Sequence, residues 1–414
     1  MHKGTEFMCK ELERIPEEEI QWRWKRCRKI LSELQPQAEG LLVFSRLNIY
    51  YLTGHWAAGA FWLPIQGEPA LMIRKGIERA RLEASVENIH NFKSHRDIPL
   101  VLQKQGLKAP QKAAVEMSGL SWDLGEGLRQ KIPDWEFVPG DLALKKARMV
   151  KSDWELQKIR IAGERHDQCL QRDLPQYIRP GMTEREISVL NWQVYFARGH
   201  QGQMRMGAPG EEIFLGHVAA GDSGNYPSVF NGPVGLRGEH PATPFMGYAG
   251  KVWQKGQPLT LDTGFVLEGY HTDKTQVYWA GRKEDIPEQV LAAHQFCIKV
   301  QTEVARRLYA GQKPSELFRV SQQMAEEEGW SEGFMGLNGN KVPFLGHGIG
   351  LTIDEWPVLA NKFEEPLQKN MVIALEPKIG LPELGMVGVE NTFLVAEDGG
   401  ECLTGNSYEL ICIE

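Results

Sequence analysis

Four acidic residues and one histidine in the C-terminal part of the chain have the residue types and spacing of metal ligands. They are Asp262, Asp273, His347, Glu376 and Glu390. Each acid lies in a run of apolar residues, which predicts a buried carboxylate rather than a solvated one. Four buried carboxylates need compensating positive charge, and two divalent cations would supply it. Because the ligands are oxygens with a single nitrogen, we expect Mn²⁺, Fe²⁺, Co²⁺ or Zn²⁺.

The first two acids are predicted to share one β-hairpin. Residues 258–278 have the pattern of two strands joined by a tight turn near Leu267–Gly269. Side chains that face each other across such a ladder are roughly 4.5–5.5 Å apart, so Asp262 and Asp273 can lie side by side on one face. The alternative, in which both carboxylates point to solvent, fits poorly with the apolar residues around them.

The other three candidates belong to a second, similar region. Glu376 lies in the predicted strand 371–377 and Glu390 in the predicted strand 387–395. His347 precedes them in a segment where flanking glycines let the backbone approach closely. Alone, such a histidine is more often structural than a ligand. Beside the acids it completes a site in which two ions about 3.5–4 Å apart would share carboxylates and activate a water for attack on a carbonyl.

The first of two predicted domains, residues 1–147, has an α/β pattern. Residues 17–34 are predicted to form an amphipathic helix, and residues 40–44 and 69–73 to form strands. Residues 48–54 are predicted to be a short strand or turn segment.

The second predicted domain, residues 148–414, shows signs of an internal duplication. It opens with a capping box at Ser152–Glu155, which predicts a helix running toward residue 172. Gly181–Ile187 and Gly311–Leu317 share a glycine, a glutamate five positions on and then an aliphatic residue. Each is predicted to open a helix, and each is followed by a pair of acid-bearing strands, as two copies of one α/β half would be.

Composition excludes several classes of protein. The 414 residues are 42% hydrophobic and 24% charged with a formal net charge of −7, which is typical of a globular protein and unfavourable for binding nucleic acid or an anionic membrane. The basic run Arg23–Arg26 is interpreted as a solvated helix face. The longest apolar stretch, residues 56–65, is too short to span a membrane, and Met1–Ile20 lacks the apolar run of a secretory signal. Six scattered cysteines predict reduced thiols in a cytoplasmic protein: Cys9, Cys27, Cys169, Cys297, Cys402 and Cys412.

The order Asp, Asp, His, Glu, Glu, within the motifs LDTG, HTDKTQ, GHGIGL, ALEP and GVENTFLV, resembles the pita-bread metallopeptidases. This family includes Xaa-Pro aminopeptidases, prolidases and methionine aminopeptidases, with creatinase as a non-metal relative. The resemblance covers residues 148–412. The motifs LLVFSRLNIYYLTG and RMVKSDWELQKIRIAG are similar to the creatinase-type leading domain of the prolidase and Xaa-Pro branch.

This resemblance implies an α+β protein in which a smaller α/β domain precedes a pita-bread domain of two α/β halves, with a curved antiparallel sheet flanked by helices. It also implies that Asp262 binds one ion, that His347 and Glu376 bind the other, and that Asp273 and Glu390 bridge the two. Glu376 would move the proton from the water to the leaving nitrogen. The expected reaction is hydrolysis of a Xaa-Pro peptide bond in a short peptide or small amide substrate, by a homodimer.

The chain departs from the family pattern at Asn231, Asp354 and Gly388. Histidines usually stand at the first two positions and contact the substrate, and an arginine usually stands at the third. Asn231 can still donate a hydrogen bond, whereas an ionised Asp354 cannot, so we hypothesise that the substrate brings a cationic or donor group to Asp354. His240, His217 and His271 are candidates to replace the missing imidazoles, although each is more often a packing or surface histidine.

Two other functions stay open at this stage. One is a metalloenzyme of different chemistry, an amide or amidine hydrolase or a lyase acting on a small molecule. The other is a catalytically silent binding module on the same fold. Retention of all five ligand types argues against the binding module, because binding alone has no use for four clustered carboxylates.

Overall fold

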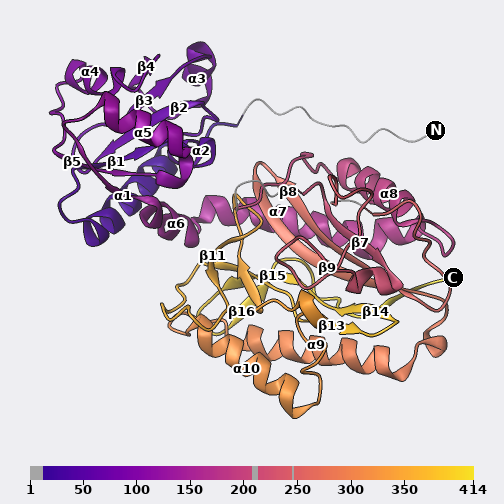
Figure 1. Ribbon diagram of the computed structural model, residues 1–414. Helices are drawn as coiled ribbons and strands as arrows, with labels where there is room; N and C mark the ends of the chain where they lie inside the picture. Colours follow the sequence, from indigo (N-terminus) through magenta and orange to yellow (C-terminus); the bar gives the residue numbers. More distant parts are fainter. Residues whose placement is uncertain (1–12, 208–212, 245–246) are drawn as a thin grey trace. The chain divides into compact units, whose positions relative to one another are not determined.

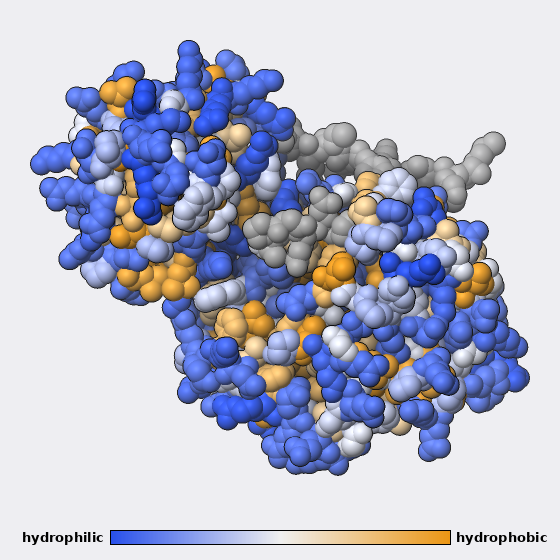
Figure 2. All heavy atoms as spheres, viewed as in Figure 1, coloured by the Kyte–Doolittle hydropathy of each residue, from blue (hydrophilic) through white to orange (hydrophobic). Residues whose placement is uncertain are grey.

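A computed structural model describes residues 13–207, 213–244 and 247–414, and the chain divides into two compact units, Met1–Arg148 and Met149–Glu414 (Figure 1). Cys9 lies outside the described residues. The other five cysteines are free thiols. Figure 2 shows hydrophilic side chains over most of the visible face, with scattered apolar residues. In the described part of the chain, no helix combines the length and the apolar character needed to cross a membrane.

The first unit is built on a six-stranded mixed sheet with the order β4-β3-β2-β1-β5-β6. Its strands are β1 (Gly40–Val43), β2 (Gly59–Pro64), β3 (Ala70–Ile73), β4 (Ile89–Asn91), β5 (Lys112–Val115) and β6 (Glu136–Pro139). Its helices are α1 (Glu17–Leu34), α2 (Arg46–Thr53), α3 (Ile77–Glu83), α4 (Asp97–Lys104), α5 (Trp122–Lys131) and α6 (Asp141–Met149). The strands at the centre of the sheet are buried on both faces, which explains their continuous apolar runs.

Helix α1 confirms the predicted amphipathic helix, and its spacing explains why. Ile20, Trp24, Cys27 and Leu31 recur every three or four residues and are buried. The interpretation of Arg23–Arg26 as a solvated face is wrong for Arg23, which lies on this same buried stripe. The Arg23 guanidinium lies 2.6 Å from Glu19 and donates to the carbonyl of Tyr51.

The prediction of a strand or turn at residues 48–54 is wrong, because this segment forms helix α2. The Ser45 hydroxyl accepts a hydrogen bond from the amide of Asn48 at the start of the helix, and Gly54 ends it with a left-handed φ of 79°. These two caps satisfy backbone groups that would otherwise lack partners. The aromatic and β-branched side chains that suggested a strand instead pack one face of the helix, where Ile49 and Leu52 are fully buried.

Within residues 149–207, 213–244 and 247–414, the second unit forms three sheets, with the orders β17-β9-β8-β7, β11-β10-β12-β15-β16 and β13-β14. The strands are β7 (Gly216–Ala220), β8 (Pro258–Leu267), β9 (Tyr270–Ala280), β10 (Gly346–Gly348), β11 (Glu355–Val358), β12 (Val372–Leu375), β13 (Lys378–Leu381), β14 (Gly385–Gly388), β15 (Asn391–Val395), β16 (Gly400–Cys402) and β17 (Ile411–Ile413). The helices are α7 (Asp153–Gln168), α8 (Glu184–Ala197), α9 (Glu288–Arg306) and α10 (Pro314–Glu327). A π-helical turn at Cys169–Asp173 prolongs α7 and confirms the predicted helix toward residue 172.

Two apolar cores divide the second unit into halves. In the first, side chains of α7 and α8 such as Ala162 and Ile187 pack against Leu261 of β8. In the second, side chains of α9 and α10 pack against β12 and β15. Both helices predicted from the repeated glycine-to-glutamate pattern are present as α8 and α10, and the capping box at Ser152 is confirmed. Each half therefore places a helical layer behind its own acid-bearing strands, as a duplicated α/β unit requires.

Gly163 in α7 allows the closest backbone contact of this first layer. A Cβ at this position would lie 2.1 Å from the carbonyl oxygen of Leu403, whereas a Cβ on Gly125 of α5 would meet nothing within 4 Å. We expect Gly163→Ala to lower the free energy of unfolding of its unit by about 1–3 kcal/mol, because the helix must move away from Leu403.

Gly125→Ala is the matched control. Alanine is favoured over glycine in a helix by about 1 kcal/mol where space permits, so this variant should be neutral or more stable. The free energies of unfolding of both variants can be measured by hydrogen exchange in increasing urea, followed on peptides from α7 and α5. Equal stability of the two variants would show that the Leu403 contact does not constrain α7.

Candidate metal centre

Asp262 and Asp273 lie on the hairpin formed by β8 and β9, as predicted. The strands are joined by Glu268 and Gly269, whose φ angles of 51° and 86° are those of a two-residue hairpin turn. In the observed register Asp262 faces Thr275, and Asp273 faces Gly264. The two carboxylates are therefore diagonal neighbours on one face, not the directly opposed pair that the sequence suggested.

Glu376 and Glu390 lie at breaks between strands. Glu376 follows the last residue of β12 and precedes β13, and Glu390 lies between the end of β14 and the start of β15. Both side chains are buried, with exposed fractions of 4% and 1%. The prediction that each acid sits inside one continuous strand is therefore wrong in detail, although the burial is confirmed. A break lets the chain change direction and turn a carboxylate toward the hairpin.

His347 is the central residue of β10 and points one ring nitrogen at the acids. Its Nδ1 lies 3.0 Å from the carbonyl of Gly348, and its Nε2 lies 3.6 Å from Glu376 Oε1. A ring that donates through Nδ1 to a carbonyl keeps a lone pair on Nε2, as a metal ligand needs. The predicted role of the flanking glycines is confirmed, because a Cβ on Gly346 would lie 2.1 Å from the carbonyl oxygen of Ala374.

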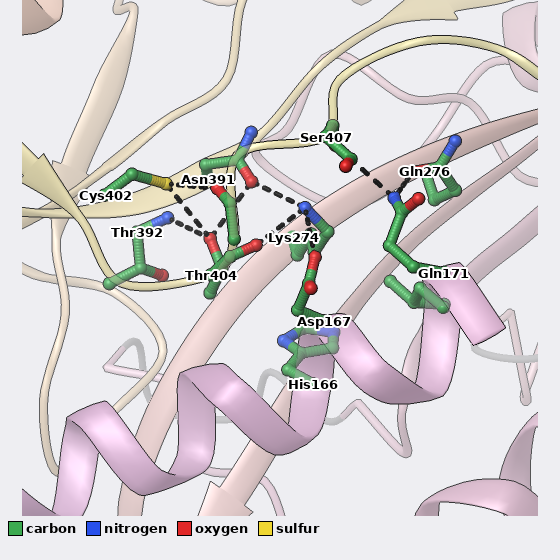
Figure 3. A network of polar contacts seen from close by, with 12 residues as sticks. His166, Asp167, Gln171, Lys274, Gln276, Asn391, Thr392, Cys402, Thr404 and Ser407 are labelled. Atoms are coloured by element: carbon green, nitrogen blue, oxygen red, sulfur yellow. Dashed lines mark hydrogen bonds and ion pairs between the residues drawn. The ribbon is translucent and has the colours of Figure 1, made fainter. Parts of the chain in front are cut away.

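A buried polar network holds the two halves of the site in register. The amide of Asp273 donates to the Thr392 hydroxyl at 2.9 Å, and this hydroxyl donates to the Asp273 carbonyl at 3.0 Å. Next to it, the buried Lys274 ammonium donates to Asn391 Oδ1 and to the Thr404 carbonyl (Figure 3). Asp273 and Lys274 belong to β9, and Thr392 and Asn391 belong to β15, so these bonds hold the strand of Asp273 against the strand that follows Glu390.

The five predicted ligands form two overlapping groups of three. Ligand atoms of Asp273, His347 and Glu390 all lie within 4.8 Å of one another, and so do those of Asp262, Glu376 and Glu390. Such distances suit donors around a common cation, whose bonds to oxygen and nitrogen are about 2.0–2.2 Å long. The first group therefore fits a divalent ion of the kind the donor set favours.

A cation of the chain itself lies in the second group. Lys378 Nζ is 2.7 Å from Glu390 Oε2, 3.1 Å from Glu376 Oε2 and 3.4 Å from Asp262 Oδ2. The sequence analysis missed this residue, although a lone lysine in an apolar strand, two positions after a buried glutamate, is a signal that could have found it. The donors of this second group are thus already bonded to an ammonium.

The pKa values of the clustered carboxylates shift in different directions. Burial and the charge of Asp262 raise the pKa of Asp273 well above its usual range, and burial together with Asp273 does the same to the pKa of Glu390. Burial also raises the pKa of Asp262, but Lys378 and neighbouring hydrogen bonds outweigh it and leave the pKa below normal. Lys378 thus favours the charged form of Asp262, whereas Asp273 and Glu390 hold a proton more readily than usual, as expected for acids that lack a cation.

The predicted substrate-binding residues lie at three different places. Asp354 accepts a hydrogen bond from the amide of Gly207, and burial raises its pKa. Asn231 is exposed, on the loop after the 3₁₀ turn Gly221–Asn225. His240 is also exposed, and its Nδ1 accepts from the amide of Ala242 in its own turn. The structure gives Asp354 a partner within the chain, and the role of all three toward a substrate stays a prediction.

Of the two other histidines considered, His217 lies nearer to the acids. It faces Asp262 directly in the pairing of β7 with β8, and it is buried against the ring of Phe230 at 5.0 Å between centroids. Both of its ring nitrogens are buried, and burial lowers its pKa. His271, in contrast, is fully engaged: it accepts from the amide of Arg205 and lies 3.0 Å from the Gly350 carbonyl, and burial lowers its pKa to about 3.

Comparison with known proteins identifies the family of the chain. Residues 157–397 match the model of metallopeptidase family M24, and residues 23–150 match that of the creatinase/prolidase N-terminal domain. The chain belongs to metallopeptidase family M24. It is thus a hydrolase of the metallopeptidase type, and the family resemblance is confirmed. Membership of this family implies that the chain binds divalent metal ions, as expected, and acidic groups that could hold them are present.

The similarity to individual relatives extends over both units of the chain. It is 25% identical over 366 residues to the Xaa-Pro dipeptidase of Pyrococcus furiosus, covering 88% of this chain and 93% of that one. The crystal structure of an X-Pro aminopeptidase from Thermotoga maritima superposes with a TM-score of 0.75 at 23% identity, covering 94% and 99%. A Xaa-Pro dipeptidase from Bacillus anthracis gives 0.76 at 23%, covering 95% and 99%. The predicted fold, a pita-bread unit behind a creatinase-type domain, is confirmed.

Thr275 supports two ligands at once, which predicts a role in metal affinity. Its hydroxyl lies 3.0 Å from Asp262 Oδ1 and 3.1 Å from Glu390 Oε2. We expect Thr275→Val to weaken metal binding about 10-fold or more, as loss of a group that orients ligands commonly does. Competition with a chelating dye measures the dissociation constant.

Thr260→Val is the matched control for this variant. Thr260 is a buried threonine on the adjacent strand, and its hydroxyl donates to the Met386 carbonyl instead of to an acid. An equal loss of metal affinity in both variants would mean that Thr275 acts through folding and not through the ligands.

Proposed function

We propose that this chain is a metal-dependent hydrolase that cleaves short peptides at the bond preceding proline. The observation that carries the proposal is the convergence of three buried carboxylates, the half-buried carboxylate of Asp262 and one imidazole from four separate segments. The similarity to Xaa-Pro dipeptidases along nearly the whole chain supports the substrate class. In this proposal residues 148–414 hold the catalytic machinery, and residues 1–147 are non-catalytic.

The group of Asp273, His347 and Glu390 would hold a Mn²⁺, Fe²⁺, Co²⁺ or Zn²⁺ ion. When bound, such an ion lowers the pKa of a water and polarises the scissile carbonyl. The family resemblance assigns one ion to Asp262 and the other to His347 and Glu376, with Asp273 and Glu390 bridging them. In the structure, Asp262, Glu376 and Glu390 form the second group that could hold an ion. Occupation of that position depends on Lys378, which lies among these three acids.

Glu376 is proposed as the residue that moves the proton. Its Oε2 accepts from Lys378 at 3.1 Å, and its Oε1 faces His347 Nε2 at 3.6 Å. Burial raises its pKa, and Lys378 and His347 offset part of that increase. A carboxylate held in this way can take a proton from the attacking water at one oxygen and deliver it to the amide nitrogen as the C–N bond breaks.

Three properties of the protein outside the reaction complete the proposal. Five free cysteines are in keeping with a reducing compartment, so we place the enzyme in the cytoplasm. The family resemblance suggests a homodimer, which light scattering on the purified protein measures. Asp354, partly buried and close enough to His347 to be affected by its charge, is proposed to lie beside the substrate together with Asn231 and His240.

A substrate panel tests the proposed function. The purified chain, loaded in turn with each of the four metals, should release proline from Xaa-Pro dipeptides or cleave longer Xaa-Pro peptides. Matched Xaa-Ala peptides are the control, and their turnover should be at least about 10-fold lower, the discrimination that a fitted hydrophobic pocket commonly provides. Equal turnover of both series, or none with any metal, would reject the substrate class.

Glu376→Gln tests the proton transfer. The amide has the same size and keeps an oxygen toward the site, but it cannot accept the proton from water. We expect kcat to fall about 10²–10⁴-fold with little change in KM. Metal content, determined by mass spectrometry on the same sample, separates a chemical defect from loss of the ion. A variant that retains its metal and nearly full kcat would show that Glu376 is not the proton carrier.

A further inference from the structure

The position of Lys378 distinguishes the two ligand groups of the centre. Lys378 is the first residue of β13, and its side chain is completely buried. Its Nζ donates to Glu390 Oε2 at 2.7 Å and to Glu376 Oε2 at 3.1 Å, and it lies 3.4 Å from Asp262 Oδ2. These three acids are the members of one ligand group, and the ammonium contacts an oxygen of each of them.

A divalent ion on the same three acids would compete with this ammonium for their oxygens. The lysine already places a positive charge among these acids, and its ammonium already contacts one oxygen of each of them. The three acids therefore need a second ion less than they would without the lysine. The lysine and a second ion compete for this position.

The surrounding backbone confines the lysine. Lys378 pairs with Gly388 across β13 and β14, and a Cβ on Gly388 would lie 3.0 Å from Lys378 Cγ. The Lys378 carbonyl accepts from the amide of Met335 at 2.9 Å. The glycine thus leaves room for the stem of the lysine, and the strand pairing keeps that stem directed at the acids.

Another buried lysine of this unit shows a different arrangement. The Lys274 ammonium donates to Asn391 Oδ1 and the Thr404 carbonyl, and it lies 3.5 Å from Asp167 (Figure 3). None of those partners is a predicted metal ligand. Among the described residues, the acids that the Lys378 ammonium contacts are all predicted metal ligands.

We propose that Lys378 takes the place of one of the two cations, so that the centre binds a single divalent ion on Asp273, His347 and Glu390. Asp262 then acts mainly as a partner of the lysine and of Thr275, and not as a ligand of the ion. This inference rests on the proposed function only in requiring that the chain bind a divalent ion, and it replaces the two-ion centre expected from the sequence.

Metal stoichiometry of the full-length protein tests the proposal without any measurement of activity. After saturation with Mn²⁺ and removal of the excess, the parent protein should hold about one ion per chain, and its paramagnetic resonance spectrum should be that of isolated Mn²⁺ ions. Lys378→Ala removes the ammonium and opens its space, so this variant should take up a second ion and show a spin-coupled pair. Two coupled ions in the parent, or a single ion in Lys378→Ala, would overturn the proposal.

A matched pair of aspartate variants keeps the test decisive if Lys378→Ala does not fold. Asp273→Asn should weaken Mn²⁺ binding at least about 10-fold, whereas Asp262→Asn should leave the affinity of the single ion nearly unchanged. A comparable loss of bound Mn²⁺ in both variants would contradict the proposal, because it would make both aspartates ligands. If the protein binds Mn²⁺ but cleaves no Xaa-Pro peptide, the proposed substrate fails while these measurements still decide the number of ions.

Discussion

The mutual repulsion of four clustered carboxylates, three of them buried, is the constraint on which this centre depends. Burial alone disfavours a charged carboxylate, and each neighbouring acid adds to that penalty. Such a cluster is stable only if cations are held among the acids. Lys378 supplies one positive charge that is always present, and it neutralises the side of the cluster that contains Asp262. The side formed by Asp273, His347 and Glu390 keeps its demand for a cation from solution.

The duplicated architecture explains how four acids can meet at one place. Each half of the second unit packs its helices on one side of its strands and leaves the other side for polar residues. The halves are joined where the amide of Thr275 donates to the Glu390 carbonyl and where Asp273 bonds to Thr392. Because the ligands come from both halves, no single half contains a complete site, and the polar network around Lys274 and Thr404 determines how well the ligands fit an ion (Figure 3).

The predicted metal ligands match the family motifs, whereas the residues predicted to contact the substrate do not. All five ligand positions are retained, and they converge in space. At the positions that usually carry imidazoles, Asp354 is bound to a backbone amide and Asn231 is exposed, while His217 faces Asp262 with both ring nitrogens buried.

Local rules read from the sequence predicted the elements best where caps and periodicity agreed. Helix α1, the capping box at Ser152 and the hairpin that carries Asp262 all follow from short-range patterns. Residues 48–54 show the limit of this approach, because their side chains fit a strand or a helix. The caps at Ser45 and Gly54 favour the helix.

By itself the sequence predicted the five side chains that the structure brings together, because acids in apolar segments have few uses other than binding cations. Only the tertiary structure decided the diagonal register of the two aspartates and the breaks that carry the two glutamates. It alone revealed Lys378 as a cation inside the cluster. The physical reason is distance: strand patterns specify which face a side chain occupies, but the separation between an ammonium and three carboxylates from other strands depends on how the halves pack.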